Sequence, residues 1–162
     1  MSDTLVSPEA RAMIGQVSEE RSGTVYKKEF QRWAAAVGDL NPLYFDDDAA
    51  KAAGYREVVM PPMFLSHVLL GVTFLDSLRP DGIPKGGGIS LPLPERRMAG
   101  GEETTYYQPI YPGDVLTSTR TLADITEKHG RSGDFVLVTW ETAYRNQDGD
   151  LVASSTSSMI AR

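Results

Sequence analysis

The sequence contains no cysteine and only two histidines, His67 and His129. The absence of cysteine excludes a disulfide framework and a thiolate site, and two histidines leave little for a transition-metal centre. No apolar run reaches the roughly 18 residues that a membrane span needs, and the N-terminal segment, with Asp3 and Glu9, lacks the apolar core of a signal peptide. We therefore expect a cytoplasmic protein without a metal or another cofactor.

Positive charge is also scarce. Against 22 Asp and Glu there are 16 Lys and Arg, which gives a formal net charge of −6 and a pI near 4.9. This charge opposes attraction to nucleic-acid phosphates and anionic membranes, and no cluster of basic residues offsets it locally. Hydrophobic residues make up 41% of the chain, enough for the core of a single domain over residues 1–162.

Helical patterns fill the first half of the sequence. Apolar residues recur at three- and four-residue spacing before Gly38, a residue type that commonly ends a helix. The apolar run from Met63 to Leu78 predicts a long helix, the most buried of the domain. Shorter helices are expected from Pro8 to about Ile14 and from about Asp47 to Ala53.

Strand patterns fill the second half, after a loop rich in proline and glycine from Arg79 to Met98. Helices followed by a meander of strands predict an α+β domain whose curved antiparallel sheet wraps around the long central helix. For glycines 86 to 88 a flexible loop is favoured over a phosphate-binding loop, because no GK[ST] follows. Alternation predicts a short strand over Gly23–Tyr26 and longer strands over Glu102–Ile110, Val115–Glu127, Phe135–Asn146 and Leu151–Arg162, the last two joined by an Asp148-Gly149 turn.

The segment GDLNPLYFDDDAAKAAGY, from Gly38 to Tyr55, has the composition of a rigid polar turn. Asp39 and Asn41 are short polar side chains that can bond backbone groups of the turn, and Pro42 moves Asn41 out of the helical region. Such a turn can be purely structural or can present a carboxylate to a ligand.

Together with VVMPPMF, YYQPIYPGDVL and TAYRNQDGDLVASS, this segment resembles the MaoC-like dehydratase family, the (R)-specific enoyl-thioester hydratases of hotdog fold. The resemblance covers nearly the whole chain. It implies a lyase of fatty acid or lipid metabolism that adds water to a trans-2-enoyl thioester, or removes it from an (R)-3-hydroxyacyl thioester. It further implies a substrate carried on coenzyme A or acyl carrier protein, and two hotdog domains that pair edge to edge into a double hotdog.

The sequence departs from the family pattern twice. Members carry GDxNPxH, whose Asp and His activate one water; here Asp39 and Asn41 match, but Tyr44 replaces the His and is a poor proton acceptor near pH 7. The glycine whose backbone N–H stabilises the thioester oxygen corresponds to Pro62, which has no N–H. The resemblance therefore implies a non-catalytic, substrate-binding half of a heterodimer or heterotetramer, paired with a catalytic hotdog subunit that carries the Asp and His.

By the same resemblance, acyl-binding candidates are Met60, Pro62, Met63 and Phe64. Arg96 and Arg97 are candidates for a phosphate of coenzyme A, although paired loop arginines are commonly only solvated.

Three alternatives stay open: a self-sufficient homo-oligomeric hydratase that uses Asp39 and Tyr44, a non-enzymatic acyl-thioester-binding protein, and a thioesterase. The thioesterase is disfavoured because the central helix expected to carry its carboxylate has no Asp or Glu from Met63 to Leu75. His67 is expected in the core or an interface, and His129 in an exposed hairpin turn.

Overall fold

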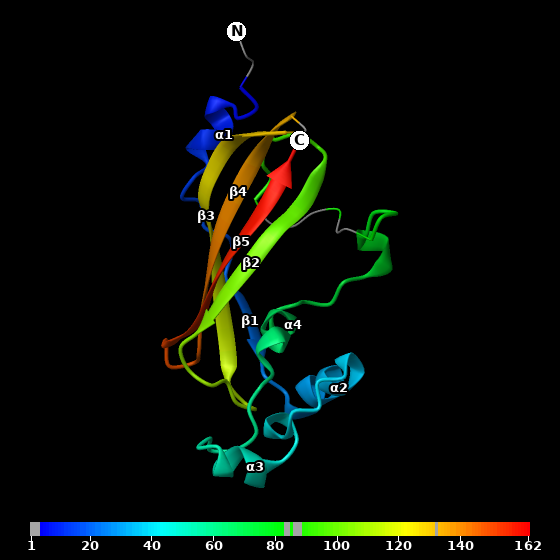
Figure 1. Ribbon diagram of the computed structural model, residues 1–162, viewed down its shortest axis with the longest axis vertical. Helices are drawn as coiled ribbons and strands as arrows, with labels where there is room; N and C mark the ends of the chain where they lie inside the picture. Colours follow the sequence, from blue (N-terminus) through cyan, green and yellow to red (C-terminus); the bar gives the residue numbers. More distant parts are fainter. Residues whose placement is uncertain (1–3, 83–84, 86–88, 132) are drawn as a thin grey trace.

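The structure, a computed structural model, describes residues 4–82, 85, 89–131 and 133–162 (Figure 1). Its main element is one antiparallel sheet of five strands in the order β1-β3-β4-β5-β2. Register shifts near Leu122 in β3 and Gly101 in β2 interrupt the ladders, as bulges do where a sheet bends. The strands are β1 Arg21–Thr24, β2 Arg97–Tyr106, β3 Val115–Gly130, β4 Gly133–Arg145 and β5 Leu151–Ala161.

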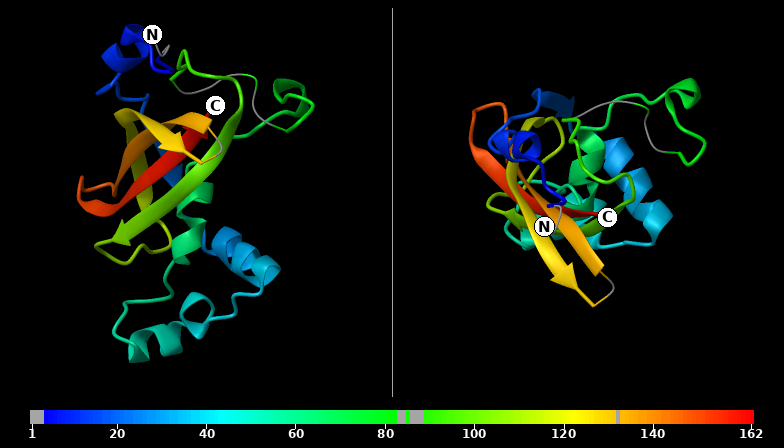
Figure 2. Two further views of the ribbon diagram at one scale, coloured as in Figure 1. Left: turned by 45° about the horizontal axis from the view of Figure 1, so that its top comes forward. Right: turned by 90° about the horizontal axis from the view of Figure 1, so that it is seen from above.

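In the part of the chain that the structure describes, four short α-helices accompany the sheet: α1 Pro8–Ala12, α2 Lys27–Val37, α3 Asp47–Ala52 and α4 Leu65–Val68. Single 3₁₀ turns lie at η1 Pro42–Tyr44, η2 Pro62–Phe64 and η3 Leu75–Ser77. Helix α1 lies at one end of the sheet, whereas α2, α3 and α4 gather at the other end (Figures 1 and 2). Among the described residues, no helix has the length and apolar content needed to cross a membrane.

Helix α4 packs closely on the edge strand β1 because that strand carries a glycine. A Cβ atom added to Gly23 would lie only 1.9 Å from the main-chain oxygen of Val68. Only a residue without a side chain permits this contact. The position of α4, and of the segment that leads into it, therefore depends on Gly23.

The buried side chains form two separate clusters. One joins the sheet to α2 and α4 and includes Phe30, Phe64 and Leu116. The other lies towards α1 and includes Leu122 and Val138. The apolar material therefore packs at both ends of the sheet.

Most predicted elements are confirmed, with shifts at their ends. The helix ending at Gly38, the helix that begins at Asp47 and the hairpin turn at Asp148 and Gly149 all lie where expected. Helix α1 ends at Ala12 rather than near Ile14. The glycines 86 to 88 lie outside the described residues, so the loop predicted for them stays a prediction.

The long central helix predicted over Met63–Leu78 is wrong. Within this range only the turn η2, the four-residue α4 and the single turn η3 form, and Val72 and Leu75 are 86% and 88% exposed. Gly71, followed by the β-branched Val72 and Thr73, weakens the helix at this point. A long apolar run therefore does not become a buried helix here.

The start of β2 was also predicted wrongly, at Glu102 instead of Arg97. The strand continues through Gly100 and Gly101 because a bulge there accommodates the extra residue opposite Ser158. It ends at Tyr106 rather than Ile110, before Pro109, which cannot donate to a ladder.

Candidate functional site

The polar turn after α2 is built by its own side chains. Gly38 ends the helix with φ 78°, in the left-handed region. Asn41 Oδ1 accepts a hydrogen bond from the Leu43 N–H at 3.1 Å, and Asp39 Oδ1 accepts a longer one from the Asn41 N–H at 3.4 Å. The Asn41 cap thus leads directly into η1, which carries Tyr44.

Asp47 fixes the next segment of the chain. Its Oδ1 accepts from the Val58 N–H at 2.9 Å, and its Oδ2 pairs with Lys27 Nζ at 3.1 Å. These two contacts lower the pKa of Asp47, the Val58 hydrogen bond most strongly. Asp47 therefore connects α2 and α3 to the segment from Val58 to Pro61, which leads into η2.

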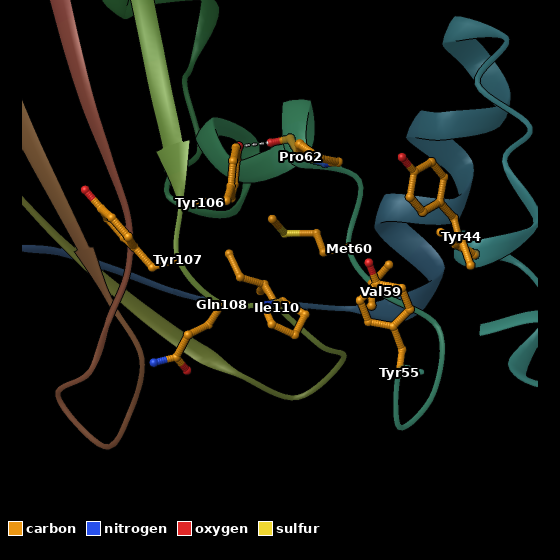
Figure 3. Close-up of a pocket in the computed structure, with 11 residues that line it drawn as sticks. Tyr44, Tyr55, Val59, Met60, Pro62, Tyr106, Tyr107, Gln108 and Ile110 are labelled. Carbon is orange, nitrogen blue, oxygen red and sulfur yellow. Dashed lines mark hydrogen bonds between the residues drawn. The ribbon is translucent and has the colours of Figure 1, made fainter. Parts of the chain in front are cut away.

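A pocket of about 360 Å³ lies between this segment and the end of β2 (Figure 3). It brings together the predicted residues Tyr44, Met60 and Pro62, which are separated in sequence. The other lining residues are Leu43, Tyr55, Val59, Tyr106, Tyr107, Gln108, Pro109 and Ile110. We call this cavity the Tyr44 pocket.

Tyr44 is 8% exposed and contributes to the wall of the pocket. Burial is the main cause that raises the pKa of Tyr44 above its ordinary value of 10.0; the charge of Asp39 adds to this, and a hydrogen bond with Asn41 opposes it. The phenol is therefore protonated at neutral pH. It cannot take a proton from water there.

Pro62 contributes an acceptor to this region rather than a donor. Its main-chain oxygen accepts a hydrogen bond from the hydroxyl of Tyr106 (Figure 3). Burial, then Tyr144 and Glu102, raises the pKa of Tyr106 to about 12, so this phenol also keeps its proton. The backbone at Pro62 cannot hydrogen-bond a developing oxyanion.

None of the eleven described residues that line the Tyr44 pocket is an aspartate, glutamate or histidine. Its wall is mostly apolar and aromatic, with phenol groups and one amide as polar groups. Such a wall can bind an acyl chain but offers no general base at neutral pH.

Two acyl-binding candidates lie outside this pocket. Met63 is 76% exposed, whereas Phe64 is 6% exposed in the core. The Phe64 ring lies 5.8 Å from Trp33 and 5.4 Å from His67, centroid to centroid, and is stacked on the imidazole. Phe64 therefore belongs to the same buried cluster as the pocket residues Tyr44 and Met60.

The two arginine candidates lie at the opposite end of β2 from Tyr106. Ten residues of extended strand span roughly 30 Å. Arg97 donates to the main-chain oxygen of Leu91 at 2.9 Å, and the Arg96 oxygen accepts from the Arg162 N–H at 3.0 Å. The structure thus does not bring Arg96 or Arg97 to the Tyr44 pocket.

Neither histidine lines the Tyr44 pocket. His67 is exposed rather than buried in the core of this chain, and its ring is stacked on Phe64. His129 lies at the exposed end of β3, as predicted, where its Nδ1 contacts Asp134 Oδ1 at 2.8 Å.

No local pattern in the sequence places Tyr106 or Tyr55 at the site. Neither was a site candidate, and Tyr106 meets Pro62, 44 positions away in sequence, only through the tertiary fold. Tyr106 and Tyr107 both line the pocket.

Comparison with known proteins defines the class. The family described as "FAS1-like, dehydratase domain region" matches residues 12–155. The chain is 24% identical to a protein in the crystal structure of the ChsH1-ChsH2 complex from Mycobacterium tuberculosis, with a TM-score of 0.73 over 94% of this chain and 90% of that one. The curled sheet is thus the hotdog fold, which a MaoC-like dehydratase from Rhodospirillum rubrum also has.

The chain belongs to the FAS1-like dehydratase region family. It is 35% identical over 138 residues to the UPF0336 protein Franean1_6066 of Parafrankia sp. (strain EAN1pec), covering 85% of this chain and 83% of the relative. It is also 29% identical over 156 residues to a "Probable enoyl-CoA hydratase alpha subunit" of Thermomonospora curvata, covering 89% of this chain but 48% of that protein. The chain therefore spans about half the length of this second relative.

Proposed function

We propose that this chain is the non-catalytic, substrate-binding subunit of an (R)-specific enoyl-thioester hydratase, in which a second hotdog subunit supplies the Asp and His. The observation that carries the proposal is the Tyr44 pocket. It has an apolar wall suited to an acyl chain, but it has a protonated phenol where a base is needed and a proline where an N–H donor is needed.

The edge strand β2 supports a partner of the same fold. It forms one border of the sheet, pairs only with β5 among the described strands, and most of its residues are exposed. Unpaired strand edges are commonly covered by another chain. Pairing there would produce the double hotdog and place the partner beside Tyr106 and the Tyr44 pocket.

The comparisons support a hydratase composed of different chains. One structural relative is a complex of ChsH1 with ChsH2, and one sequence relative is named as an alpha subunit of an enoyl-CoA hydratase. Within the complex, this chain would hold the acyl group, on coenzyme A or a carrier protein, while the partner performs the proton transfers.

The test is to co-express the chain with a hotdog protein encoded beside it that carries an intact GDxNPxH motif. We expect the two to co-purify and to hydrate trans-2-butenoyl-CoA. Replacing the partner's Asp by Asn should lower kcat by on the order of 100-fold or more, because general acid–base catalysis contributes that much.

The matched variant in this chain, Asp39→Asn, should leave kcat of the complex within about 3-fold of the parent, since Asp39 contributes only a long turn hydrogen bond here. A complex whose turnover depends on Asp39 and not on the partner's Asp contradicts the assignment of roles. Failure to associate with the partner would instead favour a binding protein without enzymatic activity.

A further inference from the structure

A second cavity, of about 370 Å³, lies on the face of the sheet that α4 only partly covers. It shares no lining residue with the Tyr44 pocket. We call it the Arg120 pocket; its wall includes Arg120, Trp140, Ser118, Ser155, Ser157 and Glu102. Along β3, Ser118 and Arg120 lie between Leu116 of one apolar cluster and Leu122 of the other, and Trp140 belongs to the second cluster.

The strand register brings the polar groups together. Arg120 in β3 pairs with Thr142 in β4, and Thr142 pairs with Ser155 in β5. In the adjacent row, Ser157 lies between Trp140 and Glu102. The polar groups thus form a continuous strip across four strands.

Arg120 is held in place but its charge is not paired. Its guanidinium lies 4.4 Å from the centroid of the Trp140 ring, and its Nη2 donates to Ser157 Oγ at 3.2 Å. In the part of the chain that the structure describes, no carboxylate forms an ion pair with it. A guanidinium has five N–H donors in a planar fork, which suits a carboxylate.

Burial removes part of the hydration of the Arg120 guanidinium. Burial lowers the pKa of Arg120, and Glu102 and Tyr144 only partly oppose that effect. An anion bound beside the guanidinium would compensate the lost hydration.

Hydroxyl groups and apolar surface complete the pocket. Ser118 and Ser155 are 9% and 5% exposed and are the two buried polar residues among those described. Leu69 and the Trp140 ring add apolar wall. The cavity therefore combines two cations, Arg120 and Arg21, and several hydroxyls with an apolar side, and its volume is in the range of small-molecule sites.

We propose that the Arg120 pocket binds a small carboxylate with an apolar body, with the carboxylate at Arg120 and the body against Trp140 and Leu69. Glu102 lies in the same wall and repels this ligand, so it sets an upper limit on affinity. The site is separate from the proposed hydratase role, and its test does not depend on turnover.

The test uses the Trp33→Phe variant, in which Trp140 is the single tryptophan of the chain and reports on the pocket by fluorescence. Octanoate and octanamide serve as probes because they share an apolar body and differ in charge. We expect octanoate to change the Trp140 emission and to bind more tightly than octanamide.

Substitutions on the two sides of the pocket should act in opposite directions. Arg120→Gln should weaken octanoate binding by roughly 10-fold, the effect of losing a hydrogen bond to a charged group. Glu102→Gln should strengthen it, since a repulsion is removed, and neither change should alter octanamide binding. Arg32→Gln, at an exposed position of α2, is the matched control and should change nothing.

Thermal melts check that each variant folds. If Arg120→Gln does not fold, Glu102→Gln still tests the proposal. Equal affinity for the two probes, no binding of either, or an Arg120→Gln effect of the same size on both would overturn the proposal.

Discussion

The hydroxyl of Tyr106 at the end of β2 donates a hydrogen bond to the main-chain oxygen of Pro62 at the start of η2. This contact ties the sheet edge to the segment where a hydratase needs a free N–H. We expect Tyr106→Phe to lower the free energy of unfolding by about 1 kcal/mol, the net value of such a hydrogen bond. Urea denaturation measures the change. The Tyr107 hydroxyl contacts Ser154 Oγ on the exposed sheet, so Tyr107→Phe should lower the free energy of unfolding by less. Equal losses for the two variants would contradict the special role of Pro62.

The Asp47 contacts predict a pH-dependent stability. Because the folded-state pKa of Asp47 is lowered, its contribution is fully present above the unfolded value of 3.8 and is lost as the pH falls through the lower, folded-state pKa. Asp47→Asn should therefore lower Tm at neutral pH, and its difference from the parent should shrink in acid below pH 3.8. Asp48→Asn, one residue away, is the control. A Tm difference that stays constant across this range would show that the Asp47 charge is not responsible.

Adjacent side chains in η2 should respond very differently to truncation. Phe64→Ala removes a buried ring and should cost about 3–5 kcal/mol. Met63→Ala removes an exposed side chain and should change stability by no more than about 0.5 kcal/mol. Chemical denaturation compares the two. A similar small effect for both would mean that Phe64 is not in the core.

Tyr44 should have no part in proton transfer. Its raised pKa keeps the phenol neutral throughout the range in which a hydratase works. In the complex with the catalytic subunit, Tyr44→Phe should therefore leave the pH dependence of kcat unchanged between about pH 6 and pH 9. A lost or displaced limb of that pH profile would show that the phenol titrates during turnover.

The parts of the fold that the sequence predicted correctly are those with local causes. Gly38, Asn41 and Asp46 each bond groups within five residues, so their turns and caps can be read from sequence. The conformation of the segment after α4 could not be predicted in this way. Leu70, Val72, Phe74 and Leu75 have the apolar character of a buried helix, but in this chain they are mostly exposed.

The candidate site was predictable only in part, for the same reason. The resemblance located Tyr44, Met60 and Pro62, which the structure brings into one pocket. It also suggested Arg96 and Arg97. These residues lie at the start of β2, whereas the Tyr44 pocket lies at its other end. Tyr106 carries no local signal, because its partner Pro62 is 44 residues away.

The most direct test of the account is the turnover of trans-2-butenoyl-CoA by the purified chain alone, with Asp39→Ala measured beside it. Because Tyr44 supplies no base and Pro62 no oxyanion donor, we predict that the rate is at least about 100-fold below that of the two-subunit complex and is the same for the parent and for Asp39→Ala. Robust turnover by the lone parent chain that Asp39→Ala abolishes would contradict the account.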